Sequence, residues 1–244
     1  MMSEALSKLN GYVLKARAYP ALILTLPIGV TLTLLWPGIG IERLAPLAAA
    51  AGLPFLITNI VRGQGQRLER HLERRWGGMP TTQMLRLTDE RNNPDLLRRR
   101  RQALQDLTGE DLPTSTDEQN HPKRSDERYV AATRLLITKL GDTRETHPRV
   151  HEENTNYGFW RNSLAIKPFA MICLIILLGV NAWSLMLGRD PQLVGVTIGV
   201  TVLAILFWII TVRPERVLQH GRTYATRLFE TLDWAPVTPT PPPS

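Results

Sequence analysis

The sequence predicts an all-α polytopic membrane protein with four transmembrane helices and a cytoplasmic helical domain inserted between spans 2 and 3. Three observations support this fold class. Long apolar stretches are concentrated in residues 19–61 and 168–212, and each region is long enough for a hairpin of two spans. The residues between them are polar and carry helix start and stop signals. Lys and Arg flank the outer ends of both hairpins.

Composition narrows the class further. The 244 residues carry a formal charge of +7 and include one cysteine, Cys173, inside an apolar stretch. No disulfide is therefore possible within one chain. The segregation of apolar residues excludes an ordinary soluble globule, and glycine without a regular period excludes a collagen-like chain.

Four spans are expected, over residues 19–36, 44–61, 168–187 and 193–212. Each approaches the roughly 20 apolar residues that cross about 30 Å of hydrocarbon. The first two are short and contain two prolines each, which membrane helices tolerate where neighbouring helices satisfy the freed backbone groups. A secretory signal peptide is the alternative for the first stretch. It is disfavoured because no small-residue cleavage site follows and a second apolar stretch comes soon after.

The distribution of Lys and Arg predicts the orientation. Basic residues precede the first and third spans and follow the second and fourth. The connectors 37–43 and 188–192 each contain a single basic residue, Arg43 and Arg189 respectively. Cytoplasmic loops of membrane proteins carry excess positive charge. Both termini and the middle segment are therefore expected on the cytoplasmic side of a bacterial inner membrane. Aromatic residues fall near the expected membrane boundaries: Trp36, Tyr157, Trp160, Trp183 and Trp208.

Five segments follow from these boundaries: an N-terminal segment with hairpin 1 (1–61), a cytoplasmic helical domain (62–166), hairpin 2 (167–212), an amphipathic C-terminal helix (213–234) and a Pro-rich tail (235–244). The amphipathic helix either docks on the cytoplasmic domain, which we favour, or lies on the inner membrane surface. The tail is expected to be extended or disordered because of its prolines.

Three helices are expected in the cytoplasmic domain. They cover residues 62–76, 94–108 and 125–140, and glycine follows each of them. Asn93 is a good N-cap residue for the second helix, with proline at the next position. Residues 114–123 are expected to form a loop.

The basic half of this domain is the candidate ligand site. Residues 62–101 contain 11 Arg against 5 acids, whereas residues 102–153 contain 7 Lys and Arg against 11 acids. Because guanidinium groups suit phosphate oxygens, the basic half predicts a nucleotide or a short single-stranded nucleic-acid ligand. The alternative is contact with anionic lipid headgroups or with the acidic half of a neighbouring subunit. The candidate phosphate-binding residues are Arg74, Arg75, Arg86, Arg98, Arg99, Arg100 and Arg101.

Three short segments carry further expectations. The arginines 98–101 are expected outside the packing face of their helix, which contains Leu96, Leu97, Ala103, Leu104 and Leu107. The turn 77–80 is expected to precede a helix N-terminus, which is either an anion site beside Arg74, Arg75 and Arg86 or structural punctuation. A cluster of polar and aromatic residues directly before the third span is expected to connect the cytoplasmic domain to the membrane helices. Its members are Asn154, Asn156, Tyr157, Trp160, Arg161 and Asn162.

Charged residues are absent from the central part of every expected span, which argues against proton-coupled transport. Small or mildly polar residues occur there instead. They are expected to serve helix packing within one subunit, an oligomer seam or the wall of a water-filled path. The candidate seam or pore residues are Asn59, Asn181, Gly195, Thr197, Gly199 and Thr201.

No motif predicts catalysis. Gly63-Gln64-Gly65 lacks the preceding strand and the lysine of a phosphate loop. His147 and His151 stand four residues apart, but Pro148 lies between them and no further ligand pair follows, so surface or structural histidines are favoured over a metal site. No Ser, Cys or Thr lies in a nucleophile motif. The sequence therefore predicts no catalytic residue, no metal, no cofactor and no enzyme activity.

Three segments, LKARAYPALILTLPIG near the start, RWGGMPTTQMLR (75–86) and NYGFWRNSLAIKP (156–168), resemble a family of bacterial four-span membrane proteins, most of them uncharacterised. The resemblance covers the whole order of two spans, a cytoplasmic domain and two spans. That layout is similar to membrane effectors of antiphage defence, such as the Hailong membrane effector, which is paired with a nucleotidyltransferase and gated by short DNA oligomers. The resemblance implies a signalling-enzyme partner, but it assigns no functional residue, because no effector motif matches a position here.

The expected function is an oligomeric inner-membrane channel or membrane-disrupting effector, gated through the basic cytoplasmic domain by a nucleotide or short nucleic-acid signal, with a role in antiphage defence. Its expected partners are membrane lipids and further copies of the chain. The alternative is a non-conducting membrane anchor or scaffold that recruits a cytoplasmic protein.

Overall fold

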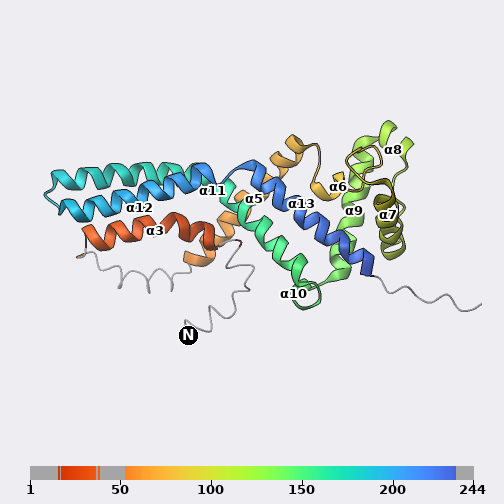
Figure 1. Cartoon of the computed structure of the whole chain (residues 1–244), viewed down its shortest axis with the longest axis horizontal. Coiled ribbons are helices and arrows are strands. Elements are labelled where there is room, and N and C mark those ends of the chain that lie inside the picture. The colour runs from red at the N-terminus through yellow and green to blue at the C-terminus, as the bar shows by residue number, and fades with distance from the viewer. Residues whose placement is uncertain (1–15, 17, 37, 39–52, 235–244) are drawn as a thin grey trace, which may run out of the picture. The chain divides into compact units, whose positions relative to one another are not determined.

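The computed structural model describes residues 16, 18–36, 38 and 53–234 (Figure 1). Within these ranges the chain is helical and contains no strand, which confirms the all-α prediction. The helices form two compact units, one from Met1–Leu72 and Thr155–Val217 and the other from Glu73–Asn154 and Leu218–Ser244. Packing contacts define these units, so their limits differ from the expected membrane boundaries.

The first unit contains the apolar helices. α3 (Tyr19–Leu35) packs against α12 (Pro191–Ile210). α11 (Pro148–Met186) and α12 are each long and apolar enough to cross a membrane, and they lie where the third and fourth spans are expected. α3 has 17 residues, with Pro27 inside it. α5 (Leu53–Trp76) begins within the second expected span, and the first half of that span lies outside the described residues.

Large apolar side chains point outward from α11 and α12. Phe169, Ile176 and Leu203 are 63%, 62% and 67% exposed. The buried polar side chains of these helices include Thr31, Asn181, Ser184, Thr197 and Thr201. Soluble proteins bury their large apolar residues and rarely expose extended apolar surface, whereas small and polar residues between helices are typical of packing in lipid.

Contacts between α5 and α11 hold the polar end of this unit. The Tyr157 hydroxyl and Arg161 Nη1 donate to the two carboxylate oxygens of Glu69 at 2.9 and 2.7 Å. Asn162 Nδ2 donates to the backbone carbonyl of Ala16 at 2.7 Å. Three members of the cluster before the third span therefore join helices of a single unit.

Gly65 allows α5 and α11 to approach closely. A Cβ atom at this position would lie 2.1 Å from Asn162 Oδ1, and Asn162 is itself buried. Side chains cannot approach at that distance, so only glycine fits here without a shift. The Gly63-Gln64-Gly65 segment thus has a packing role at its last residue.

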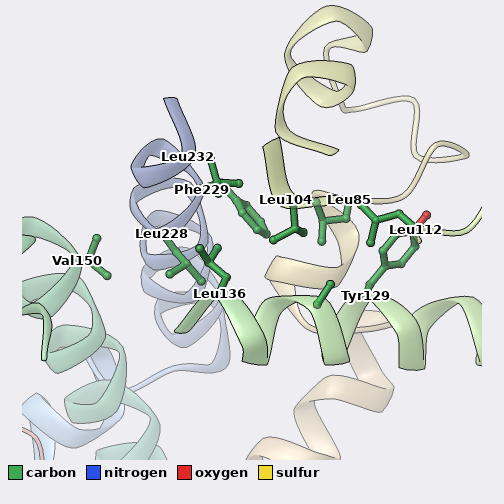
Figure 2. Packing of buried hydrophobic residues seen from close by; sticks show 10 residues of the cluster. Leu85, Leu104, Leu112, Tyr129, Leu136, Val150, Leu228, Phe229 and Leu232 are labelled. Carbon is green, nitrogen blue, oxygen red and sulfur yellow. The ribbon is translucent and has the colours of Figure 1, made fainter. Parts of the chain in front are cut away.

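The second unit is a small helical domain. Its elements are α6 (Pro80–Gln83), α7 (Pro94–Thr108), α8 (Ser115–Asn120), α9 (Pro122–Leu140), α10 (Thr143–Thr146), the later turns of α13 (Pro214–Glu230) and η3 (Thr231–Trp234). Figure 2 shows Leu228, Phe229 and Leu232 in one cluster with Leu104 of α7 and Leu136 of α9. The end of the amphipathic C-terminal helix therefore docks on this domain.

Local signals account for the helix limits. The Asn93 side chain accepts hydrogen bonds from the backbone N–H groups of Asp95 and Leu96 at the start of α7. Gly109 ends α7 with a φ of 73°, a left-handed conformation that favours glycine. Both features confirm the sequence prediction for this helix.

The loop expected over residues 114–123 is wrong, because the structure places α8 there. The Thr114 side chain accepts from the Asp117 N–H, while the Asp117 carboxylate accepts from the Thr114 backbone N–H. This reciprocal capping box satisfies two donors at the helix start. Its polar sequence hides the helix from an analysis that relies on apolar periodicity.

Gly65→Ala should lower the thermal stability of the purified full chain in detergent, because the new methyl group collides with Asn162. We expect a loss of about 1–3 kcal/mol, as for other overpacked sites. Gly63→Ala is the matched control, since a Cβ there meets nothing within 4 Å and alanine favours a helix over glycine by about 0.5–1 kcal/mol. Equal melting temperatures for the two variants would contradict this packing role.

Candidate functional site

The four consecutive arginines of α7 occupy different environments. Arg98 and Arg99 are exposed, and Arg98 lies 3.7 Å from Asp95 with both side chains about 80% exposed. Arg100 is half-buried, with its guanidinium carbon 5.9 Å from the centre of the Phe229 ring. Arg101 is only 9% exposed. The run therefore offers two exposed guanidinium groups rather than four.

Arg101 belongs to the buried face of α7, which corrects the expectation that it lies outside that face. Leu97, Arg101 and Leu104 are buried together, whereas Leu96 and Leu107 are 38% and 37% exposed. Positions 97, 101 and 104 follow the i, i+4, i+7 spacing of one helix face. Burial of the arginine is tolerated because its guanidinium group donates to three nearby oxygen atoms.

A buried hydrogen-bond network surrounds Arg101. Its Nη1 donates to the Leu85 carbonyl oxygen at 2.8 Å and to the Tyr129 hydroxyl at 2.6 Å, and its Nη2 donates to the Pro113 carbonyl oxygen. The Tyr129 hydroxyl in turn donates to Glu118. The network joins α7, α8 and α9 through side chains, so the charge of Arg101 serves the fold.

Glu118 is the acidic centre of this network. Its carboxylate oxygens accept from the Leu87 N–H at 2.8 Å and from the Thr88 N–H and hydroxyl at 2.9 and 2.8 Å. Burial raises the pKa of Glu118, but the hydrogen bonds from Tyr129, Leu87 and Thr88 outweigh burial and hold its pKa below the ordinary value. Burial and the bond to Glu118 raise the pKa of Tyr129. Glu118 was not predicted as a special residue, because nothing in its local sequence distinguishes it from a surface glutamate.

Arg86 also acts within the fold. Its Nε and Nη2 donate to the two carboxylate oxygens of Asp126 at 2.9 and 2.6 Å, and this bond is the largest cause that raises the pKa of Arg86. The pair borders a cavity of about 220 Å³ lined also by Thr88, Glu118 and Pro122. With Asp126 on its guanidinium group, Arg86 has limited capacity for a phosphate.

A helix follows the turn 77–80, as expected, but α6 is only four residues long. The Gln83 side chain donates to the carbonyl oxygens of Trp76 and Gly78 at 2.7 and 3.0 Å. These contacts favour structural punctuation over an anion site. Arg74 and Arg75 lie in the exposed last turn of α5.

The candidate seam residues of α12 lie on two different faces of this helix. Asn181 Nδ2 donates to Thr201 Oγ1 at 3.1 Å, and Thr201 and Thr197 each donate to a carbonyl oxygen of the preceding turn. Gly195 and Gly199 are exposed, and a Cβ at either meets nothing within 4 Å. Packing within the subunit thus accounts for the threonines and leaves the glycines without a contact among the described residues. The side chain of Asn59 lies outside the described residues.

The aromatic residues divide in a similar way. Trp183 is 58% exposed, as expected for a membrane boundary, but Trp208 and Tyr157 are buried. Trp36 lies under the guanidinium group of Arg189 at 5.5 Å, and Trp160 under that of Arg216 at 5.2 Å. Trp208 therefore packs inside the first unit close to the end of α12.

Across the part of the chain that the structure describes, no group of three or more His, Cys, Asp or Glu is arranged to hold a metal ion. The chain matches no protein-family model, no curated protein and no solved structure in the comparisons made. The candidate site therefore rests on its own geometry. Two separate candidate surfaces remain, the exposed arginines of α7 in the second unit and the outward glycines of α12 in the first.

Arg101→Met should destabilise the second unit, because methionine keeps much of the side-chain length but leaves the Leu85, Pro113 and Tyr129 oxygens without their donor. We expect a loss of about 3 kcal/mol in the free energy of unfolding, measured by denaturant titration of the full chain. The matched control Arg98→Gln/Arg99→Gln removes exposed charge from the same helix and should stay within about 0.5 kcal/mol of the wild type. A similar loss in both variants would contradict the distinction between buried and exposed arginines.

Proposed function

We propose that the chain is an integral protein of the bacterial inner membrane with four spans and both termini in the cytoplasm. The outward apolar surface of α11 and α12 carries this proposal, because a helix pair that exposes Phe169, Ile176 and Leu203 needs an apolar surrounding. The contact between Trp36 and Arg189 supports α3 as a further span beside α11 and α12. It brings the end of α3 to the turn between α11 and α12, as expected if α3 crosses the same bilayer.

We further propose that several copies assemble into a channel or a membrane-disrupting effector. Gly195 and Gly199 form an outward groove of small residues on α12. Such grooves let membrane helices approach closely. The polar side chains of α12 bond within the chain. A conducting path would therefore run between subunits and not through one chain.

In this proposal, the exposed arginines of the second unit receive the signal. Arg98 and Arg99 suit the phosphates of a nucleotide or a short single-stranded nucleic acid, while Arg101 and Arg86 support the fold beneath them. A signalling enzyme would supply the ligand, and the similarity of layout to membrane effectors supports a role in antiphage defence. The protein itself would carry no cofactor and catalyse no reaction.

A non-conducting anchor or scaffold is the second candidate. The observation that favours it is the pairing of Asn181 with Thr201 inside the chain, which uses polar groups that a pore would present to water. In this case the exposed surface of the second unit would recruit a cytoplasmic protein.

Gly195→Leu/Gly199→Leu should reduce the detergent-solubilised mass to smaller species, because leucine side chains hold neighbouring helices apart. The mass is measured by light scattering coupled to size-exclusion chromatography. Gly179→Leu is the matched control, since Gly179 is also exposed on an apolar helix and its Cβ meets nothing within 4 Å. An unchanged oligomer in the double variant would move the seam to another surface.

Arg98→Ala/Arg99→Ala should uncouple the membrane helices from their signal. The measurement uses a dye that reports membrane potential, in cells whose membranes contain equal amounts of the wild type or the variant. The wild type should depolarise the membrane in response to the signal, whereas the variant should depolarise it permanently or never. Charge-assisted hydrogen bonds contribute roughly 1.5–3 kcal/mol each, so oligonucleotide binding to the purified chain should weaken by about two to four orders of magnitude. Wild-type binding should also weaken as salt rises.

The control for this experiment is Lys123→Ala/Arg124→Ala, which removes two exposed charges from α9 in the same unit. It should retain regulation and binding. Poor membrane insertion with regulation retained in the α7 variant would indicate lipid contact instead. Normal regulation, together with no salt-dependent binding by the wild type, would favour the scaffold.

A further inference from the structure

Three cations gather at the polar end of α11 and α12. Lys167 Nζ donates to the Val212 carbonyl oxygen at 2.8 Å, which satisfies one of the free carbonyl groups at the end of α12. Arg213 follows Val212 directly and is exposed, and Arg216 lies in the first turn of α13 with its guanidinium group 5.2 Å from the Trp160 ring. All of these residues belong to the first unit.

The spacing of these residues along α11 and α13 shows how they are arranged. Trp160 and Lys167 are seven residues apart on α11, so they lie on the same face and about 10 Å apart along the axis. Arg213 and Arg216 are three residues apart, and the Arg213 carbonyl accepts from the Arg216 N–H at 3.2 Å. The bond from Lys167 to Val212 joins the two pairs. Burial lowers the pKa of Lys167, and the nearby charge of Arg213 lowers it further.

No carboxylate forms an ion pair with Lys167, Arg213 or Arg216 among the residues that the structure describes. Arg161 at the same end differs, because Glu69 binds it at 2.7 Å. Cations held close together without an acid repel one another. A negatively charged group from outside the chain would remove this repulsion.

The surface beside the three cations is apolar. Ile209 and Ile210, one helical turn before Arg213, are 46% and 54% exposed. Apolar surface followed by positive charge matches the order of acyl chain and headgroup in a bilayer leaflet, and the Trp160 ring lies about one and a half to two helical turns beyond Lys167 on the polar side. A soluble phosphate compound would use the charge but not the apolar surface.

We propose that Lys167, Arg213 and Arg216, together with Trp160, bind the phosphate headgroup of an anionic phospholipid in the cytoplasmic leaflet. This inference rests on the membrane integration proposed above and is independent of whether the chain conducts. The ligand is a lipid rather than a free phosphate because the apolar part of the site continues directly from the charged part.

The test uses the full chain, purified in neutral detergent and exposed to an equimolar mixture of phosphatidylglycerol and phosphatidylcholine. Native mass spectrometry measures the ratio of the two lipids retained. The wild type should favour phosphatidylglycerol. Since each Lys or Arg near an anionic membrane surface contributes about 1 kcal/mol, Lys167→Gln/Arg213→Gln/Arg216→Gln should lower this preference about tenfold or more.

The charge-matched control Lys123→Gln/Arg124→Gln/Arg134→Gln removes three exposed cations from α9 and should keep the preference. If the triple variant of the site does not fold, Arg213→Gln/Arg216→Gln leaves the Lys167 bond in place and should still lower the preference. An equal loss in the control, or an unchanged ratio in the site variants, would overturn the inference. Displacement of the lipid by soluble glycerol phosphate would overturn the lipid assignment in favour of a free phosphate compound.

Alkaline carbonate treatment of membranes from expressing cells separates this inference from the proposed function. A chain that resists extraction but shows no preference for phosphatidylglycerol has lost only the lipid site. A chain released by carbonate is not integral, and both the membrane proposal and the lipid site are then wrong.

Discussion

The structure depends on one constraint, which is that a polar group removed from water needs a partner within the chain. In the first unit Asn181 meets Thr201, and Glu69 meets Tyr157 and Arg161. In the second unit Arg101 meets carbonyl groups and Tyr129. Both units thus contain buried hydrogen-bonded sets, but they also bury polar atoms without a hydrogen-bond partner among the described residues, such as Asn181 Oδ1 in the first unit and Thr133 Oγ1 in the second. The difference between them lies outside, where the first unit exposes apolar residues and the second exposes charged ones.

Much of the helical architecture could be predicted from sequence, because its signals are local. Asn93 and Pro94 begin α7, Gly109 ends it, and the apolar stretches after Lys167 give α11 and α12. α8 was missed because a capping box and buried Glu118 stabilise a helix that has no apolar periodicity. The close approach at Gly65 could not be predicted either, since it depends on Asn162, which is distant in sequence.

The candidate site was predicted less well than the fold, for a physical reason. Charge counting gives the same weight to every arginine, but burial separates them. Arg101 lies four residues after Leu97 and three before Leu104, so the helix period alone puts it on the buried face. Lys167, Arg213 and Arg216 were assigned a role in orientation but were not grouped as one site, because they are far apart in sequence and the bond from Lys167 to Val212 depends on the fold.

The two basic sites differ in what a bound phosphate can affect. Arg98 and Arg99 are exposed side chains on a helix that is fixed by Leu97, Arg101 and Leu104, so a ligand there adds charge without disturbing the packed face. Arg213 and Arg216 lie where α12 gives way to α13, and Lys167 donates to the Val212 carbonyl oxygen there. A headgroup bound at this place would act on the backbone at the end of α12. If the proposed membrane arrangement is correct, lipid composition would influence α12 at its own end, whereas a soluble signal would act through the helical domain.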